Sequence, residues 1–400
     1  MFTSITESAM SKVPSKETST RYNAPWINRK CKRLSRRQKR AYKKAKQTNT
    51  DSDWERFRSM RKKNKEACRS AYTTHVNETI MSGNPKRFYS YIKSKKQDRV
   101  GVSTLKVNDT LIIDDGKKAE ILNHQYCSVF SVPNGKKPVI PSRIDQSIND
   151  FTISANGILK LIRSLKPFKA TGPDGIKAKF LIEFATEILP ALELIFNASL
   201  KQGEVPKEWK HALIVPAYKG NGKSRSNPES YRPISLTSIV SKLMEHIIYS
   251  KIMTHLTENN ILSDFQHGFR EKRSCESQLL LAVDDFANTL NQGGQTDSIL
   301  LDFSKAFDKV DHQKLCHKLE HYGIRGRQLS WIKSFLSQRT QQVVVNGKSS
   351  SLAQVKSGVP QGTVLGPLLF LVYINDLPLC VGSKVRLFAD DAYLYRSIHL

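Results

Sequence analysis

The sequence predicts an α+β protein, and two kinds of segment lead to this prediction. Some segments place apolar residues at helical spacing, as in "HQKLCHKLEHYG" (312–323), where Leu315, Leu319 and Tyr322 share one face. Others are short, unbroken apolar runs that end in acidic residues, as in "SILLD" (298–302). Runs of this kind are typical of strands buried on both faces. We therefore expect helices packed on the back of a small antiparallel sheet.

The first twenty residues and the basic segment after them are expected to differ in order. Residues 1–20 are rich in Ser and Thr and are predicted to be disordered. Residues 21–95 are predicted to form a basic, mostly helical arm, because 21–72 alone holds 19 Lys and Arg against four acids. We expect the arm to contact phosphates, although a solvated helix or a nuclear-localisation signal would have the same composition. The candidate nucleic-acid-binding residues are Arg36, Arg37, Lys39, Arg40, Lys43 and Lys44.

The composition of the whole chain limits the class of partner. The 400 residues carry 64 Lys and Arg against 36 Asp and Glu, a net charge of +28, which predicts a polyanionic partner. The longest apolar run, 364–374, is shorter than the ~20 residues that span a bilayer, so we expect no membrane partner. No secretory signal is recognisable, and the six cysteines lack zinc-ligand spacing. An intracellular, reducing compartment is therefore expected.

Two further regions follow the arm. Residues 96–160 are predicted to be a connector with a small hairpin, turning at Asn108-Asp109, and a helix near 114–130. Residues 161–400 are denser in apolar residues and form the predicted main domain. Within it, 211–238 is predicted to form a strand, a long basic loop and a second strand. That loop would either fold over phosphates or lie solvated on the surface.

Three aspartates are candidates for a metal site. Asp302 ends the apolar run at 299–301, and Asp390 and Asp391 follow a second run in "LFADDAYLY". An ionised carboxylate at the end of a buried strand needs a base or a metal as partner. Hard oxygen ligands suit Mg²⁺ or Mn²⁺, and two such ions form a clamp for phosphoryl transfer. Each motif alone is weak, because acidic residues also occur at helix N-termini.

The order of the motifs is more specific than any one of them. From 169 to 395 the chain contains, in sequence, "ATGPDGI", "IVPAYKGNGK", "YRPISLTSIVSKLMEHII", "QHGFREKRSCESQL", "LDFSKAFDKVDH", "SGVPQGTVLGPLLFLVYINDL" and "FADD". In this order they resemble the reverse transcriptases of jockey-like, non-LTR retrotransposons. "NPKRFYSYIKSKK" (84–96) resembles the region that joins endonuclease to polymerase in such elements. The resemblance implies the fingers and palm of a right-hand polymerase fold, and it argues against an unrelated two-metal nuclease or phosphatase.

The resemblance also implies roles for single residues. Asp302 and Asp390 would bind the metals, with Asp391 in support. Phe307 would be the steric gate that excludes a 2′-hydroxyl, unless it only forms a core pair with Phe303. The remaining implied substrate-binding residues are Arg232 and Lys219 for the triphosphate, which would otherwise contact template backbone, and Gln361 with Gly362 for the nucleotide and template.

The implied activity is RNA-directed DNA polymerisation, in which dNTPs are added to a DNA 3′-hydroxyl on an RNA template with Mg²⁺ or Mn²⁺. The implied partners are the element's own RNA and a DNA primer or target, in a ribonucleoprotein of nucleus and cytoplasm. Only nine residues follow "FADD", so we expect a fragment without a thumb. The alternative function is that of a catalytically silent remnant that only binds nucleic acid.

Overall fold

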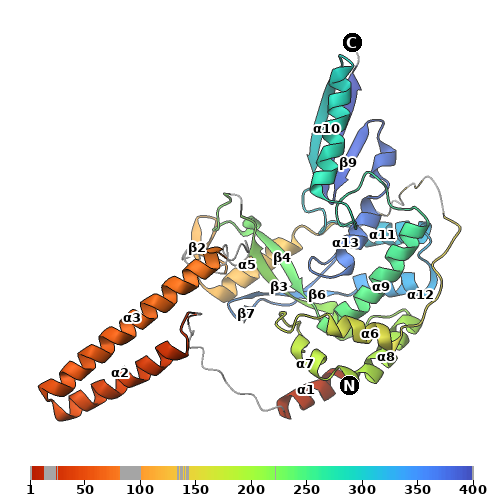
Figure 1. Cartoon of the computed structure of the whole chain (residues 1–400). Helices are drawn as coiled ribbons and strands as arrows, with labels where there is room; N and C mark the ends of the chain where they lie inside the picture. The colour runs from red at the N-terminus through yellow and green to blue at the C-terminus, as the bar shows by residue number, and fades with distance from the viewer. Residues whose placement is uncertain are drawn as a thin grey trace. The chain divides into compact units, whose positions relative to one another are not determined.

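The computed structural model describes residues 2–12, 24, 26–81, 101–132, 135, 138, 140, 144–220 and 222–398. The chain divides into two compact units (Figure 1). One unit is Val13–Val100, and the other combines Met1–Lys12 with Gly101–Leu400. Helices and small sheets are both present, so the predicted α+β class is confirmed at this level.

The smaller unit is a helical hairpin of α2 (Arg29–Thr48) and α3 (Asp51–Met81), which Figure 1 shows as two long rods. Asn28 caps α2 by accepting the Cys31 N–H, and Asn49 ends the helix in a left-handed conformation with φ 48°. These local signals fit the helix predicted for the basic segment. The segment 84–96, which also resembled the retrotransposon enzymes, lies outside the described residues.

The N-terminal segment corrects one prediction. Residues Phe2–Lys12 form helix α1, with Thr6 only 4% exposed, whereas disorder was expected for 1–20. Tertiary contacts can stabilise a short helix that its composition alone would not. Residues 13–20 lie outside the described part of the chain.

The connector contains the predicted hairpin and helix. Strands β1 (Leu105–Val107) and β2 (Thr110–Ile112) pair antiparallel. Asn108 and Asp109 have φ 47° and 62°, as a two-residue primed turn requires. Helix α5 (Asp115–Cys127) follows, and Asp114 caps it by accepting the Lys117 N–H.

The strand–loop–strand segment predicted for 211–238 belongs to a second sheet. β3 (His211–Tyr218) and β4 (Tyr231–Leu236) pair antiparallel, and β6 (Thr340–Val345) adds to β3 in parallel. The parallel neighbour was not foreseen, because it joins segments that lie far apart in the sequence. The short strands β7 (Lys348–Ser349) and β8 (Ala353–Gln354) complete this sheet.

The largest apolar core lies between helices rather than on a sheet. Its inner side chains include Phe196, Trp331 and Leu369, all of which are fully buried. The apolar run at 364–374 corresponds to α13, which is buried in this core, and no described helix is long and apolar enough to span a membrane. The α-helices that contribute to this core are α6 (Ala155–Arg163), α7 (Ala178–Glu183), α8 (Ala185–Gln202), α9 (Ile239–Glu258), α11 (His312–His321), α12 (Gly326–Leu336) and α13 (Leu365–Ile374). Short 3-10 turns occupy Lys207–Lys210, Pro228–Ser230 and Leu377–Cys380.

The third sheet carries the three candidate aspartates. Its strands β5 (Gln295–Asp302), β10 (Asp391–Ile398) and β9 (Lys384–Phe388) lie in that order and pair antiparallel. Helix α10 (Cys275–Asn291) lies along this sheet (Figure 1).

One ionic network attaches α10 to the third sheet. Asp285 of α10 accepts hydrogen bonds from Lys384 at 2.5 Å, from Arg386 at 2.6 Å and from the Tyr395 hydroxyl. Burial acts to raise the pKa of Asp285, but these three donors outweigh it and lower the pKa to about 2. The ionised carboxylate therefore fixes the orientation of α10 against β9 and β10.

One expectation for the segment around Asp302 was wrong. Ile299 and Leu300 are 61% and 79% exposed, although the apolar run predicted a strand buried on both faces. β5 is an edge strand among the described residues, so one of its sides lacks a neighbouring strand there. Residues 304–309, which follow this strand, form turns, and Lys305 has φ 56°.

Candidate active site

Three carboxylates meet at one end of the third sheet. Asp302, the last residue of β5, is the direct antiparallel partner of Asp391, the first residue of β10. Side chains in such a pair share one face with Cβ atoms about 4.5–5.5 Å apart. Burial raises the pKa of Asp391, and so do the neighbouring charges of Asp390 and Asp302. The sheet therefore brings all three predicted residues together.

Basic side chains and two of these carboxylates line one cavity of about 610 Å³. Arg232 of β4 and Lys219, both predicted to bind substrate, line it together with Asp302 and Asp390. The basic loop at 219–230 forms one wall, which favours the phosphate-facing alternative over a solvated loop. The other lining residues are Lys223, Ser224, Asn227, Glu229, Ser230, Pro233, Phe303, Ser304, Lys305, Ala306, Phe307, Asp308 and Gln361.

The crowding of cations changes the titration of Lys219. Burial lowers its pKa to about 8, and the charges of Lys305, Lys223 and Arg232 act in the same direction. Its ammonium donates to the Glu229 carbonyl oxygen at 2.7 Å, and no acidic side chain forms an ion pair with it among the described residues. A cluster of cations of this kind is suited to an anionic ligand.

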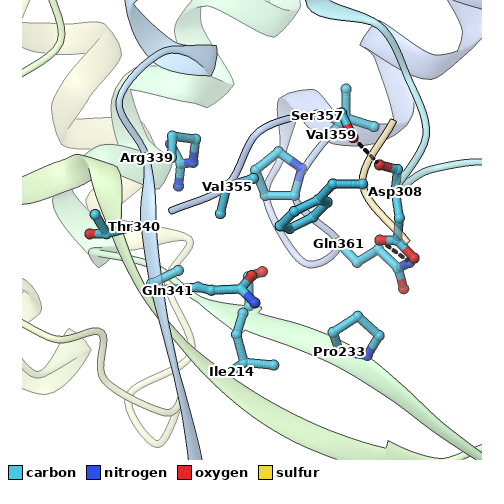
Figure 2. Close-up of a pocket in the computed structure, with 15 residues that line it drawn as sticks. Ile214, Pro233, Asp308, Arg339, Thr340, Gln341, Val355, Ser357, Val359 and Gln361 are labelled. Atoms are coloured by element: carbon cyan, nitrogen blue, oxygen red, sulfur yellow. Dashed lines mark hydrogen bonds between the residues drawn. The ribbon is translucent and has the colours of Figure 1, made fainter. Parts of the chain in front are cut away.

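The turn that follows Asp302 is attached to the "SGVPQG" loop by backbone hydrogen bonds. Gly358 N–H donates to the Val310 carbonyl and Val359 N–H to the Phe307 carbonyl, both at 2.8 Å. The Ser357 hydroxyl donates to the Asp308 carbonyl at 2.8 Å (Figure 2). The two sequence motifs thus form one rigid unit.

The side chains of Gln361 and Asp308 strengthen that attachment. Gln361 Nε2 donates to Asp308 Oδ1 at 3.4 Å, and Figure 2 shows the two side chains pointing toward each other. Burial raises the pKa of Asp308, while the charges of Lys305 and Lys219 and the bond from Gln361 oppose that rise. Sequence reasoning missed Asp308 and Lys305, although both stand inside "DFSKAFD", where Asp302 and Phe307 were the candidates.

The same loop also contacts β4 and α9. Ser235 N–H of β4 donates to the Gln361 carbonyl at 2.8 Å, and Gly362 with φ 100° leaves no room for a Cβ beside the Ser235 carbonyl. Glu245 of α9, fully buried, accepts the N–H groups of Val364 and Leu365 at 2.8 and 3.3 Å. The loop is therefore held on three sides, and no sequence signal identified Glu245.

Phe307 both lines the cavity and joins the core. Its ring stacks on Phe370 with centroids 4.3 Å apart and meets Phe269 edge-on at 6.1 Å. No ring contact joins it to Phe303 among the described residues, so the alternative of a simple Phe303–Phe307 pair lacks support. The stacking fixes the ring plane in the lining of the cavity that also contains Asp302 and Gln361.

The basic arm presents one face of α2 away from the seam with α3. Six side chains line a cavity of about 460 Å³ on this face, and they are Arg29, Lys32, Arg33, Arg36, Arg37 and Arg40. Of the predicted residues, Arg36, Arg37 and Arg40 are therefore brought together. Lys39 and Lys43 are exposed elsewhere on the helix, and Lys44 forms an ion pair with Asp53 at 3.3 Å.

The donor chemistry of the three aspartates fits a divalent cation. Within the described residues no ion pair or side-chain hydrogen bond occupies Asp302, Asp390 or Asp391, and their mutual repulsion would be relieved by Mg²⁺ or Mn²⁺. No described group of three or more His, Cys, Asp or Glu is arranged to hold a metal by itself. Mg²⁺ commonly takes one or two carboxylates and completes its shell with water and substrate phosphates, so the two observations agree.

The part of the chain that carries this site is similar to known proteins. Residues 219–398 fit the family model described as reverse transcriptase (RNA-dependent DNA polymerase). These residues form a reverse transcriptase domain of the jockey-like, non-LTR type. The probable RNA-directed DNA polymerase from transposon BS of Drosophila melanogaster is 34% identical over 275 residues, which is 65% of this chain and 28% of that protein.

Two other fruit-fly proteins have similar sequence identity to this chain. The RNA-directed DNA polymerase from mobile element jockey of Drosophila melanogaster is 33% identical over 60% of this chain, and the probable polymerase from its transposon X-element is 33% identical over 57%. The chain spans 26% of each, and so about a quarter of these relatives' length. Its reverse transcriptase domain carries the carboxylates, the basic wall and the loop described above.

The attachment of the "SGVPQG" loop predicts a stability effect. Gly358 has φ 87°, and a Cβ there would lie 2.7 Å from the backbone oxygens of Phe307 and Asp308. Gly358→Ala should therefore lower the free energy of unfolding by roughly 1–3 kcal/mol, measured by urea denaturation. Gly382→Ala is the control, since its Cβ would meet nothing within 4 Å. Equal stability of the two variants would contradict the clash.

Proposed function

We propose that the reverse transcriptase domain extends a DNA 3′-hydroxyl with dNTPs on an RNA template. The observation that supports this most is the cavity that joins Asp302 and Asp390 to Lys219, Arg232 and their basic neighbours. A nucleoside triphosphate has phosphates for the basic wall and for carboxylate-bound cations at the same time. This arrangement suits phosphoryl transfer, where positioning and charge stabilisation provide most of the catalysis.

Each part of the cavity has a role in this proposal. Asp302 and Asp390 would hold two Mg²⁺ or Mn²⁺ ions, with Asp391 in support, and these ions would supply the clamp on the attacking and leaving oxygens. Arg232 and Lys219 would orient the triphosphate. Phe307 would press against the sugar, and Gln361 with Gly362 would meet the nucleotide and the template.

The proposed partners extend beyond the cavity. The exposed basic face of α2 would bind the phosphates of RNA or DNA without reading sequence. The RNA bound in a cell would be that of the chain's own element, in a ribonucleoprotein of nucleus and cytoplasm. A protein that binds a template–primer yet never extends it would instead be a catalytically silent remnant.

Removal of one carboxylate should abolish nucleotide transfer. Asp302→Asn and Asp390→Asn each preserve the side-chain shape but lose a metal ligand, so primer extension on an RNA template with dNTPs and Mn²⁺ should cease. Without metal, both variants should be slightly more stable, because repulsion among the three carboxylates is relieved. Asp297→Asn, on the same strand at an exposed site, is the control. Full extension by Asp390→Asn would refute the metal assignment.

Replacing the ring of Phe307 should admit ribonucleotides. The stack on Phe370 fixes the ring, so Phe307→Val opens the space that a 2′-hydroxyl would need. The ratio of kcat/KM for dNTP over rNTP should fall at least about tenfold, or ~1.4 kcal/mol. Phe303→Val, in the same cavity wall, should leave the ratio unchanged. If Phe307→Val lowers kcat/KM for dNTP and for rNTP equally, so that their ratio is unchanged, the ring contributes only to packing.

Neutralising the basic face of α2 should weaken nucleic-acid binding and flatten its salt dependence. Changing Arg36, Arg37 and Arg40 to Gln should reduce the slope of log K against log salt by roughly 0.7–0.9 for each phosphate that is no longer neutralised. The matched control changes three exposed lysines of α3, Lys62, Lys63 and Lys65, and so removes the same charge outside the cavity. Equal slopes for the two triple variants would mean that only net charge matters.

A further inference from the structure

The turn that carries Asp390 has an unusual backbone conformation. Ala389, between β9 and Asp390, has φ 57°, in the left-handed region. A residue with a Cβ pays roughly 1–2 kcal/mol to occupy this region, whereas glycine does not. Such a conformation persists only where neighbouring groups hold it. The turn therefore depends on contacts from outside the two strands.

Gln266 supplies these contacts from a distant segment of the chain. Its Oε1 accepts the Ala389 N–H at 2.9 Å, and its Nε2 donates to the Ala389 carbonyl at 3.3 Å. The same Oε1 accepts the Gly268 N–H at 2.8 Å. Gln266 is 2% exposed, so water does not compete for these bonds. One amide thus pairs with both polar groups of the residue next to Asp390.

The backbone around Gln266 fixes the position of its side chain. Leu387 N–H donates to the Phe265 carbonyl at 2.8 Å, and His267 N–H donates to the Leu387 carbonyl at 2.9 Å. Gly268 passes so close that a Cβ on it would lie 2.2 Å from the Ala389 nitrogen. The segment 265–268 is therefore attached to the end of β9 as a short parallel bridge.

We propose that Gln266 is a positioning residue for the aspartate turn, holding Ala389 in its left-handed conformation so that Asp390 faces Asp302. The inference rests on the proposed role of Asp390 as a metal ligand. The amide matches its task, because only a side chain with both a donor and an acceptor can pair with an N–H and a carbonyl of one residue. Neither leucine nor glutamate can do both.

A double-mutant cycle separates positioning from general packing. Gln266→Leu removes all three bonds and should lower kcat at least about tenfold, while KM for dNTP changes less, since the basic wall is untouched. In Ala389→Gly the turn no longer needs the hydrogen bonds from Gln266, because glycine adopts positive φ freely. In the Ala389→Gly background, the loss caused by Gln266→Leu should therefore shrink to about threefold or less. Equal losses in both backgrounds would overturn the proposal.

A second variant guards against a chain that fails to fold. Gln266→Glu keeps the shape and the acceptor for the two N–H groups but loses the donor to the Ala389 carbonyl and adds a negative charge. Ala389→Gly should also reduce the loss of kcat in this variant, but by less than in Gln266→Leu, because the added charge remains near Asp390. Gln328→Leu is the matched control, since Gln328 is also 2% exposed and bonds Asp150 at 3.1 Å. Its loss, if any, should be independent of residue 389.

An activity-independent measurement distinguishes this proposal from the proposed function. Amide hydrogen exchange of residues 387–393 should quicken in Gln266→Leu and stay unchanged in Gln328→Leu. If exchange quickens in Gln266→Leu but not in Gln328→Leu, and Asp390→Asn remains active, the positioning role of Gln266 is correct and the metal assignment of Asp390 is wrong. If exchange of 387–393 does not change in Gln266→Leu, the positioning role is wrong whatever the activity of Asp390→Asn.

Discussion

The repulsion between three adjacent carboxylates is the constraint on which the rest of the site depends. Asp302, Asp390 and Asp391 meet where two strands end, and burial together with the nearby charges raises the pKa of Asp391. Like charges at this separation would move apart in a loosely held loop. The antiparallel pairing of β5 with β10 and the bonds from Gln266 keep them together. The structure thus maintains an arrangement that a cation would stabilise.

The cations that line the same cavity also repel one another. Lys219 and Lys305 lie beside Lys223 and Arg232, and the pKa of Lys219 falls to about 8. The "SGVPQG" loop is attached to the turn at 303–310 and to β4 by backbone hydrogen bonds. That attachment fixes the distance between anionic and cationic groups. A ligand with several phosphates and bound cations would neutralise both sets of charges at once.

The sequence predicted where the three carboxylates lie better than it predicted their surroundings. Strand ends with carboxylates, the turn at Asn108-Asp109 and the basic helix α2 follow from local patterns, and all are present. The exposure of Ile299 and Leu300 could not be predicted, because an apolar run records composition and not the position of a strand in its sheet. Lys305, Asp308, Glu245 and Gln266 were missed for another reason. Each acts through contacts with residues dozens of positions away, which no local spacing encodes.

The two concentrations of positive charge differ in physical character. The cations of α2 are exposed and spread along one helix face, so salt should screen them strongly and any phosphate backbone can engage them. Lys219 is partly buried among other cations, and burial contributes most to its lowered pKa. Charges in such a setting are screened less and act over short distances. The arm therefore suits capture of a long polyanion, whereas the cavity suits a compact one held in a single orientation.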